Sequence, residues 1–221
     1  MDARIQPPAR DKGMPQAVAG LKHELERRGI ALAYCADGAS AVAYLLSRIP
    51  AGATVMNGGS TTLEQIGFLA ALENGPYEWL RPRIKAVNDR DERIRMRRRA
   101  ATADYFVGGV NAITASGEIL NADGSGNRVA AYAFGAGKLF LVTGINKIVP
   151  DLAAAFDRLR NEAALQECRL LAKSTPCALT GRCDNDACRG ADRQCGKVLI
   201  IENERIPGRI CVVMIGETLG Y

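Results

Sequence analysis

The sequence has a single histidine, His23, and only 5% of its residues are aromatic. A metal site built from several histidines is therefore not expected, and neither is a catalytic triad with a histidine base. Long hydrophobic runs are also missing. No segment approaches the ~20 uninterrupted apolar residues of a membrane helix, and the best run, residues 129–142, is broken by Lys138. These absences argue against a membrane partner.

The beginning of the chain lacks the apolar core of a secretory signal, which predicts a cytoplasmic protein whose thiols stay reduced. Residues 1–12 are polar and contain two prolines, so we expect a mobile tail there. The 221-residue chain is 48% apolar and 24% charged, which is ordinary for a globular protein, and its length favours one domain. We assign residues 13–221 to a single domain that includes a cysteine-rich loop at residues 174–196.

Apolar runs of strand length alternate with segments of helical pattern. The sequence predicts helices over residues 14–28, 37–49, 57–74, 89–103, 125–134 and 150–171, and strands over residues 30–35, 53–56, 84–87, 104–110, 118–120, 138–143, 198–202 and 209–215. Strands that alternate with helices along a chain indicate an α/β fold with a mostly parallel sheet and flanking helices.

A glycine-rich loop follows the strand predicted at residues 53–56. It consists of Asn57, Gly58, Gly59, Ser60, Thr61 and Thr62. Glycines let a ligand approach the backbone closely, and the free amides and dipole of a helix N-terminus favour an anion. The order of residues is neither a Walker A loop nor a dinucleotide fingerprint. The loop could equally be a tight turn in which Ser60 or Thr61 caps the helix and Glu64 completes a capping box.

A second polar segment, residues 111–128, follows the strand at residues 104–110. Its candidate ligand-binding residues are Asn111, Asn121, Gly124, Ser125, Asn127 and Arg128. In open α/β sheets, ligands bind beyond the carboxyl ends of the strands, so we expect this segment to face the same cleft as the glycine-rich loop. Glu118 and Asp123 are the candidate catalytic acids or bases, although Asp123 before a glycine is also ordinary turn chemistry.

Positive charge is concentrated in one segment. Nine basic and three acidic residues lie between Arg81 and Arg99, so this segment carries +6 and the rest of the chain, with a net charge of +5 overall, sums to −1. Basic residues can contact phosphates, but no aromatic residue stands among them to stack on bases. We expect no specific nucleic-acid partner, and interpret the segment as a solvated helix face or as a subunit contact in a homo-oligomer.

Four of the seven cysteines lie in the loop at residues 174–196. Cys177, Cys183, Cys188 and Cys195 form the pattern C-x5-C-x4-C-x6-C. Four thiolates suit tetrahedral zinc or an iron–sulfur cluster of the 4Fe–4S type. Inert loop cysteines and a disulfide or redox switch are the alternatives.

Six blocks of sequence together resemble the short members of the lactate-utilisation (LUD) domain family. They include GGSTTLEQIG at residues 58–67, NAITASGEILNADGSGNR at 111–128 and GINKIVPD at 144–151, with further blocks at 175–183, 193–195 and 216–221. The resemblance implies a fold like that of ribose-phosphate isomerase and the CoA transferases, in which a glycine-rich loop holds a phosphate or cofactor. It also implies a link to lactate oxidation, with iron–sulfur oxidoreductase subunits as partners. Asn146 and Lys147, in the third block, join the candidate ligand-binding residues.

Three classes of function follow from these patterns. The first is a LUD-type protein of lactate or related 2-hydroxy-acid metabolism that binds an anionic metabolite at the glycine-rich loop and carries a cysteine-ligated metal. The second is an isomerase or transferase of a phosphorylated or CoA-linked metabolite. The third is a redox-sensing or regulatory module without catalysis.

Overall fold

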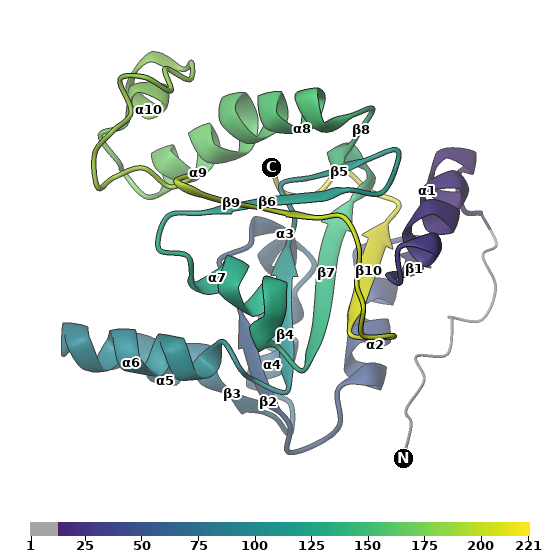
Figure 1. Cartoon of the computed structure of the whole chain (residues 1–221). Coiled ribbons are helices and arrows are strands. Elements are labelled where there is room, and N and C mark those ends of the chain that lie inside the picture. The colour runs from purple at the N-terminus through teal and green to yellow at the C-terminus, as the bar shows by residue number, and fades with distance from the viewer. Residues whose placement is uncertain (1–12) are drawn as a thin grey trace.

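A parallel six-stranded sheet, here called the main sheet, forms the centre of the protein in the computed structural model, which describes residues 13–221 (Figure 1). Its strands, in spatial order, are β1 (Ala31–Cys35), β10 (Ile210–Ile215), β7 (Lys138–Gly144), β4 (Tyr105–Gly109), β2 (Thr54–Asn57) and β3 (Glu78–Trp79), and every pair is parallel. The predicted α/β architecture is confirmed. The tail predicted at residues 1–12 lies outside the described residues.

Each face of the main sheet is covered by its own hydrophobic core, because successive side chains of a strand point to opposite faces. In β7, Leu139 and Leu141 pack into one core, whereas Phe140 and Val142 pack into the other. The first core is completed by α1 (Gln16–Arg27) and by the π-helical turn η1 (Ala131–Gly135) that continues α7 (Asn127–Ala130). The second is completed by α2 (Gly38–Arg48), α3 (Thr61–Gln65) and α4 (Phe68–Glu73).

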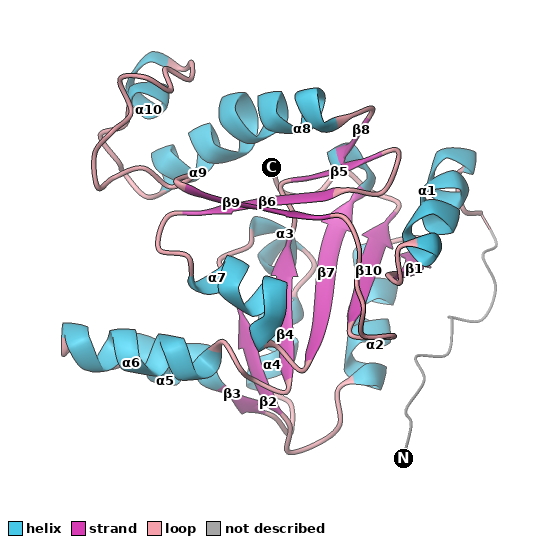
Figure 2. Ribbon diagram, viewed as in Figure 1, coloured by secondary structure: helices cyan, strands magenta, loops and turns pink. Residues whose placement is uncertain are grey.

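A second sheet, here called the small sheet, lies across one end of the main sheet (Figure 2). Its order is β8 (Ile148–Val149), β5 (Ala112–Thr114), β6 (Ile119–Asp123) and β9 (Lys197–Ile201), with β6 antiparallel to both neighbours. It is covered by α8 (Leu152–Arg158) and by the π-helical turn η3 (Leu159–Ala163), which leads into α9 (Ala164–Leu170). The sequence predicted strands at residues 118–120 and 198–202, which correspond to β6 and β9, but not their separation into a sheet of their own.

Two predicted elements are wrong. The helix expected over residues 57–74 is divided into α3 and α4 at Gly67, which adopts a left-handed conformation with φ of 76°. Residues 84–87 were expected to form a strand, but residues 80–85 form the helix α5 (Leu80–Lys85), followed by a loop. Only Ile84 is buried in α5, so the alternating burial of a strand is absent, and Pro82 fits the first turn of a helix.

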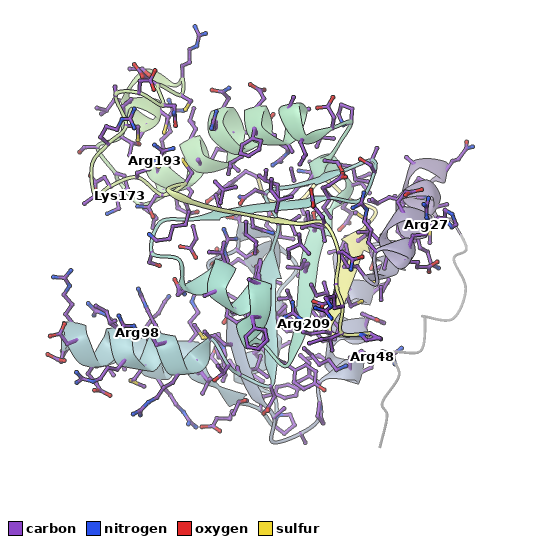
Figure 3. All side chains as sticks on the ribbon, viewed as in Figure 1. Arg27, Arg48, Arg98, Lys173, Arg193 and Arg209 are labelled. Atoms are coloured by element: carbon purple, nitrogen blue, oxygen red, sulfur yellow. The ribbon has the colours of Figure 1, made fainter. Side chains whose placement is uncertain are left out.

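The basic segment forms α5 and α6 (Arg90–Ala100), which project beside the sheet. Ala100 is the one buried residue of α6, and side chains such as Arg98 point into solvent (Figure 3). Asp89 caps α6 and the arginines gather in its last turn, which suits the helix dipole. Within residues 13–221, no helix has the length and apolar character needed to cross a membrane.

Candidate functional site

The carboxyl ends of β2, β4 and β7, three adjacent strands of the main sheet, meet at one cavity of about 170 Å³. The small sheet contributes a further wall through the end of β6 and the start of α7. Of the residues predicted to bind a ligand or to act as an acid or base, the cavity is lined by Gly58, Gly59, Ser60, Thr61, Thr62, Asn111, Asp123, Gly124, Asn127, Arg128 and Lys147. The glycine-rich loop and the segment at residues 111–128 therefore face one cavity.

The glycine-rich loop is shaped by contacts on both sides. Ser60 caps α3, since its hydroxyl accepts a hydrogen bond from the Leu63 amide at 3.3 Å. A Cβ added to Gly58 would lie 2.9 Å from Cδ of Arg128, so glycine is what lets this arginine lie directly over the loop. Arg81 also donates to the Gly58 carbonyl, and burial lowers the pKa of Arg81. The capping and ligand-site interpretations are thus compatible.

The anion-binding argument from the helix dipole is weaker than the sequence suggested. The predicted long helix is broken at Gly67, which leaves α3 with five residues. A helix of barely more than one turn aligns few peptide dipoles. Any strong preference for an anion must therefore come from charged side chains around the loop.

Lys147 is the most deeply buried charged side chain that lines the cavity, with 3% of its surface exposed. Its ammonium group donates to the Thr62 hydroxyl at 3.3 Å and to the Val110 carbonyl at 3.2 Å. Burial, followed by repulsion from Arg158 and Arg128, lowers the pKa of Lys147 to about 7. Among residues 13–221, no carboxylate forms an ion pair with it.

Asp123 and Arg128 form the junction between β6 and α7. The Asp123 carboxylate accepts hydrogen bonds from the Ser125 amide at 3.0 Å and from the Arg128 amide at 2.9 Å. The Arg128 guanidinium donates to the Ala122 carbonyl and lies over the Tyr132 ring at 5.7 Å. The Asp123 side chain therefore stabilises the turn between β6 and α7, and it also lines the cavity.

Sequence reasoning missed the residues that close the cavity from α9 and from the end of the described chain. Glu167, Gln194 and Tyr221 all line it, and the Tyr221 hydroxyl donates to the Glu167 carboxylate at 2.6 Å. Burial and this contact raise the pKa of Tyr221 to about 12. The only signal in the sequence was that residues 193–195 and 216–221 belong to blocks that resemble the family.

Four predicted ligand-binding residues lie outside the cavity lining: Asn57, Asn121, Ser125 and Asn146. The Asn57 amide accepts from the Trp79 indole at 2.8 Å and supports the loop from behind. Ser125 bonds to Asp123 and Asn127, and Asn146 accepts from the Leu219 amide, which holds the last residues beside the cavity. Asn121 is fully buried on β6, and its amide has no hydrogen-bond partner in the described chain.

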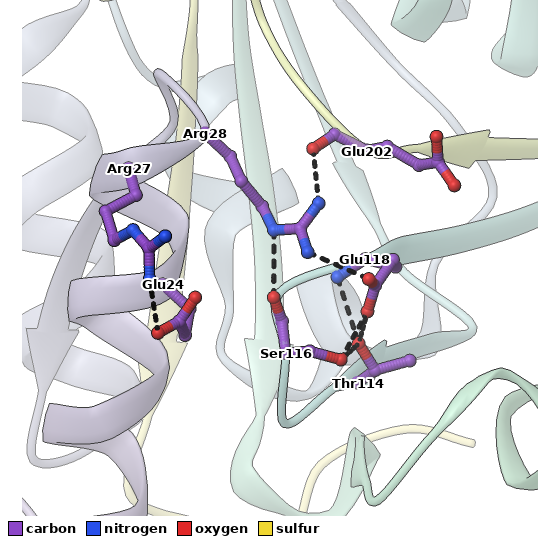
Figure 4. A network of polar contacts seen from close by, with 7 residues as sticks. All are labelled: Glu24, Arg27, Arg28, Thr114, Ser116, Glu118 and Glu202. Carbon is purple, nitrogen blue, oxygen red and sulfur yellow. Dashed lines mark hydrogen bonds and ion pairs between the residues drawn. The ribbon is translucent and has the colours of Figure 1, made fainter.

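Glu118 is not part of the cavity, and its predicted role as a catalytic acid or base is not retained. It precedes β6, at the opposite end of that strand from Asp123, and pairs with Arg28 at 2.8 Å (Figure 4). Arg28 also donates to the carbonyls of Ser116 and Glu202, so the group joins α1 to the small sheet. Burial would raise the Glu118 pKa, but the Thr114 and Ser116 hydroxyls and Arg28 outweigh it and lower the pKa to about 2.

The four cysteines of the 174–196 loop line a second, much smaller cavity of about 10 Å³. Cys177 is buried on the short helix α10 (Pro176–Thr180), and the other three lie half-buried in the loop that follows. Burial, and then the neighbouring thiols, raise the pKa of Cys183. All described cysteines are free thiols, and in residues 13–221 no three Cys, His, Asp or Glu side chains are already positioned to hold a metal ion.

Comparison with known proteins identifies the family. The model of the LUD domain matches residues 18–215, which is nearly all of the described chain. The protein belongs to the LUD domain family. The predicted resemblance is thereby confirmed. The family of this LUD protein is related to lactate utilisation.

The fold of the LUD protein is also similar to a solved structure. A DUF162 family protein from Deinococcus radiodurans superposes with a TM-score of 0.52 at 10% identity, covering 91% of this chain and 97% of that chain. At this identity the similarity concerns the fold alone. No curated protein matches the sequence.

Proposed function

We propose that this LUD protein binds a small anionic metabolite of the 2-hydroxy-acid type, such as lactate, in the 170 Å³ cavity. The observation that carries the proposal is the environment of Lys147. Its ammonium group lies against the glycine-rich loop, and the charged groups that act most strongly on it are the cations Arg158 and Arg128. Like charges that share a site disfavour each other's charged form. A bound carboxylate or phosphate would remove that repulsion.

The other charged groups of the cavity are already engaged within the protein. Asp123 accepts backbone hydrogen bonds of the β6–α7 turn, and Glu167 accepts the Tyr221 hydroxyl. Positive charge gathers at the Lys147 end, where Lys147 and Arg128 line the cavity and Arg158 also acts on Lys147. An incoming anion would meet Lys147 and Arg128 there, and charge-assisted hydrogen bonds of this kind are the strong ones.

The size of the cavity favours a small ligand. Pockets for drug-sized ligands usually have volumes of ~300–1,000 Å³, whereas this cavity has about 170 Å³. The hydroxyls of Ser60 and Thr61 and the amide of Asn127 also line it, and these groups can bond the hydroxyl of a 2-hydroxy acid. A role in 2-hydroxy-acid metabolism agrees with the family's relation to lactate utilisation. The expectation of iron–sulfur partner subunits stays a prediction.

Calorimetric titration with lactate, 2-hydroxybutyrate and inorganic phosphate at pH 6.5 tests the proposal. We expect saturable binding of at least one of these anions to the wild-type protein. The Lys147→Met variant should bind at least about tenfold more weakly, because a charge-assisted bond is lost. Lys85→Met, which removes an exposed lysine of α5, is the matched control and should bind like the wild type. Equal affinity in all three proteins would refute the proposal.

A second candidate function is an isomerase or transferase, and one observation favours it. An amine with a pKa of about 7 in a cavity, as found for Lys147, is well poised to give or take a proton at neutral pH. To test this function, the protein is incubated with sugar phosphates or acyl-CoA compounds in deuterated water. NMR then shows whether a C–H proton of the substrate exchanges with the solvent. Binding without exchange or turnover would instead favour a regulatory module.

A further inference from the structure

The cysteine-rich loop extends beyond the end of α9, away from the main sheet (Figure 1). Helix α10 packs against α9, and Cys177 and Cys168 meet there in a small apolar cluster. From residue 181 to residue 196 the chain forms only turns and irregular structure. This segment therefore has little apolar surface of its own with which to hold a single conformation.

We propose that Cys177, Cys183, Cys188 and Cys195 bind one zinc ion, and that the ion completes the folding of this loop. All four side chains line the same small cavity although they are spread over residues 177–195. Apolar packing accounts for two of them, since Cys177 packs with Cys168 and Cys195 packs against the core of the small sheet. Cys183 and Cys188 belong to no apolar cluster of the described chain, and ion binding would explain why they converge on the same cavity. Tetrahedral zinc bound by four thiolates is a common structural site.

The size of the cavity selects a single ion over a cluster. Its volume is about 10 Å³, close to the ~10–15 Å³ that one water-sized particle needs. A cube of four irons and four sulfides is far larger and would require the cavity walls to move apart. A single zinc ion needs far less space, so local changes in the loop and its thiol side chains would suffice to coordinate it.

The charges around the cavity suit a zinc–thiolate site. One Zn²⁺ with four thiolates carries a net charge of −2. Arg160 and Arg193, which line the cavity, supply +2 and Asp184 supplies −1, so the two arginines offset most of the negative charge. Arg193 is held in place because it donates to the Cys188 carbonyl at 3.0 Å and to Asn185 at 2.7 Å. Its Nε atom is buried and has no partner within the described chain, which leaves a donor for a thiolate sulfur.

The positions of the four cysteines in the loop indicate how the site would form. Cys177 is buried on α10 and fixed beside Thr175, with 3.3 Å between sulfur and hydroxyl oxygen. Cys183, Cys188 and Cys195 lie on loop segments, where small backbone changes can bring sulfurs to the ~2.3 Å zinc–sulfur distance. Ion binding is then coupled to ordering of the loop. The four thiols therefore need not have the geometry of a metal site before the ion binds.

Metal analysis of the full-length protein, purified anaerobically without added metal, tests the proposal. We expect about one zinc per chain and no stoichiometric iron or sulfide. Removal of zinc with a chelator, followed by titration with Co²⁺, should give the visible absorption of tetrahedral cobalt–thiolate coordination at about one equivalent. Each single variant Cys177→Ser, Cys183→Ser, Cys188→Ser and Cys195→Ser should lose most of the bound zinc.

Cys35→Ala is the matched control, because Cys35 is a thiol at the end of β1, far from the loop in sequence, and should leave the zinc content unchanged. The cobalt titration uses the wild-type chain, so it remains informative if a serine variant fails to fold. Iron and acid-labile sulfide in equal amounts would overturn the proposal in favour of a cluster. Protein without bound metal, in which Co²⁺ gives no thiolate absorption, would overturn it in favour of a loop with free thiols. Neither measurement involves a metabolite, so its outcome is separate from that of the anion-binding proposal.

Discussion

The ammonium nitrogen of Lys147 lies 3.3 Å from the hydroxyl oxygen of Thr62. The two residues are 85 positions apart in the sequence and come from the segments that follow β7 and β2. Parallel strands bring their carboxyl ends to the same edge of a sheet, which is why a buried lysine and a glycine-rich loop can form one site.

The affinity for a small anion should depend on pH through Lys147. Its pKa is lowered to about 7 in the free protein, and an adjacent anion favours the charged form and raises that pKa. Above pH 7, binding then requires uptake of a proton, so the dissociation constant should rise by up to about tenfold per pH unit. Below pH 7 it should be nearly constant. Calorimetry from pH 6 to pH 9 checks this, and a Lys147→Met protein with the same pH profile would contradict it.

Gly58→Ala should weaken anion binding without unfolding the protein. The new methyl group would lie 2.9 Å from Cδ of Arg128, so the arginine must shift from its position over the loop. We expect a loss of about 1 kcal/mol, or roughly fivefold in affinity, as for one impaired hydrogen bond to a charged group. Gly20→Ala is the control, because no heavy atom lies within 4 Å of its new Cβ. Unchanged affinity in Gly58→Ala would show that Arg128 does not contact the ligand.

Glu118→Gln should lower stability but leave ligand binding intact. The Glu118 pKa is lowered to about 2 by hydrogen bonds and Arg28 that outweigh the effect of burial. A carboxylate with a lowered pKa contributes stability above its unfolded-state pKa of ~4.3, and this contribution is lost as the pH falls toward 2. At pH 7 the variant should be less stable by about 1 kcal/mol, since solvent screens part of the interaction.

Urea unfolding at pH 7 and at pH 3 checks the effect of Glu118. The difference between wild type and Glu118→Gln should shrink at the lower pH. Glu73→Gln is the control, because it removes an exposed carboxylate at the end of α4. A large loss of anion affinity in Glu118→Gln at unchanged stability would restore the catalytic interpretation.

The basic helix α6 should bind nucleic acid only weakly. Its arginines are exposed, and acidic residues accompany them, as in the pair of Arg95 with Glu92 at 2.6 Å. Binding to a fluorescent duplex should show a dissociation constant of ~10⁻⁶ M or weaker at physiological salt and should weaken steeply between 50 and 200 mM salt, as nonspecific phosphate contacts do. Sequence-selective binding that persists at 200 mM salt would contradict this prediction.

The fold was largely predictable because hydrophobic periodicity and capping residues act locally. Asp37 and Asp151 cap α2 and α8 by accepting amide hydrogen bonds at 2.8 and 2.9 Å, and such caps can be recognised without tertiary structure. The failures came from residues whose conformation depends on distant contacts. Gly67 could have continued a helix, and nothing local to β5, β6 and β9 distinguishes a strand of the small sheet from one of the main sheet.

The candidate site was predictable in part for the same reason. Glycines and polar residues after strands indicated the loop at residues 58–62 and the turn at Asp123, both of which line the cavity. Glu118 is also an acidic residue in a polar segment, but it lies at the opposite end of β6 from Asp123, and only the end at Asp123 reaches the cavity. The ion pair of Glu118 with Arg28, at the end of α1, joins residues far apart in the sequence, so it could be found only from the structure.

The side chain of Cys195 lines both cavities, since it belongs to the walls of the 170 Å³ and the 10 Å³ spaces alike. A shared wall residue gives two ligands a route to influence each other's affinity, and thermodynamic linkage makes any such influence reciprocal. If zinc strengthens metabolite binding by some factor, the metabolite must strengthen zinc binding by the same factor. The occupancy of one site could then be followed by titrating the other, and the thiol loop would report the level of its small-molecule ligand.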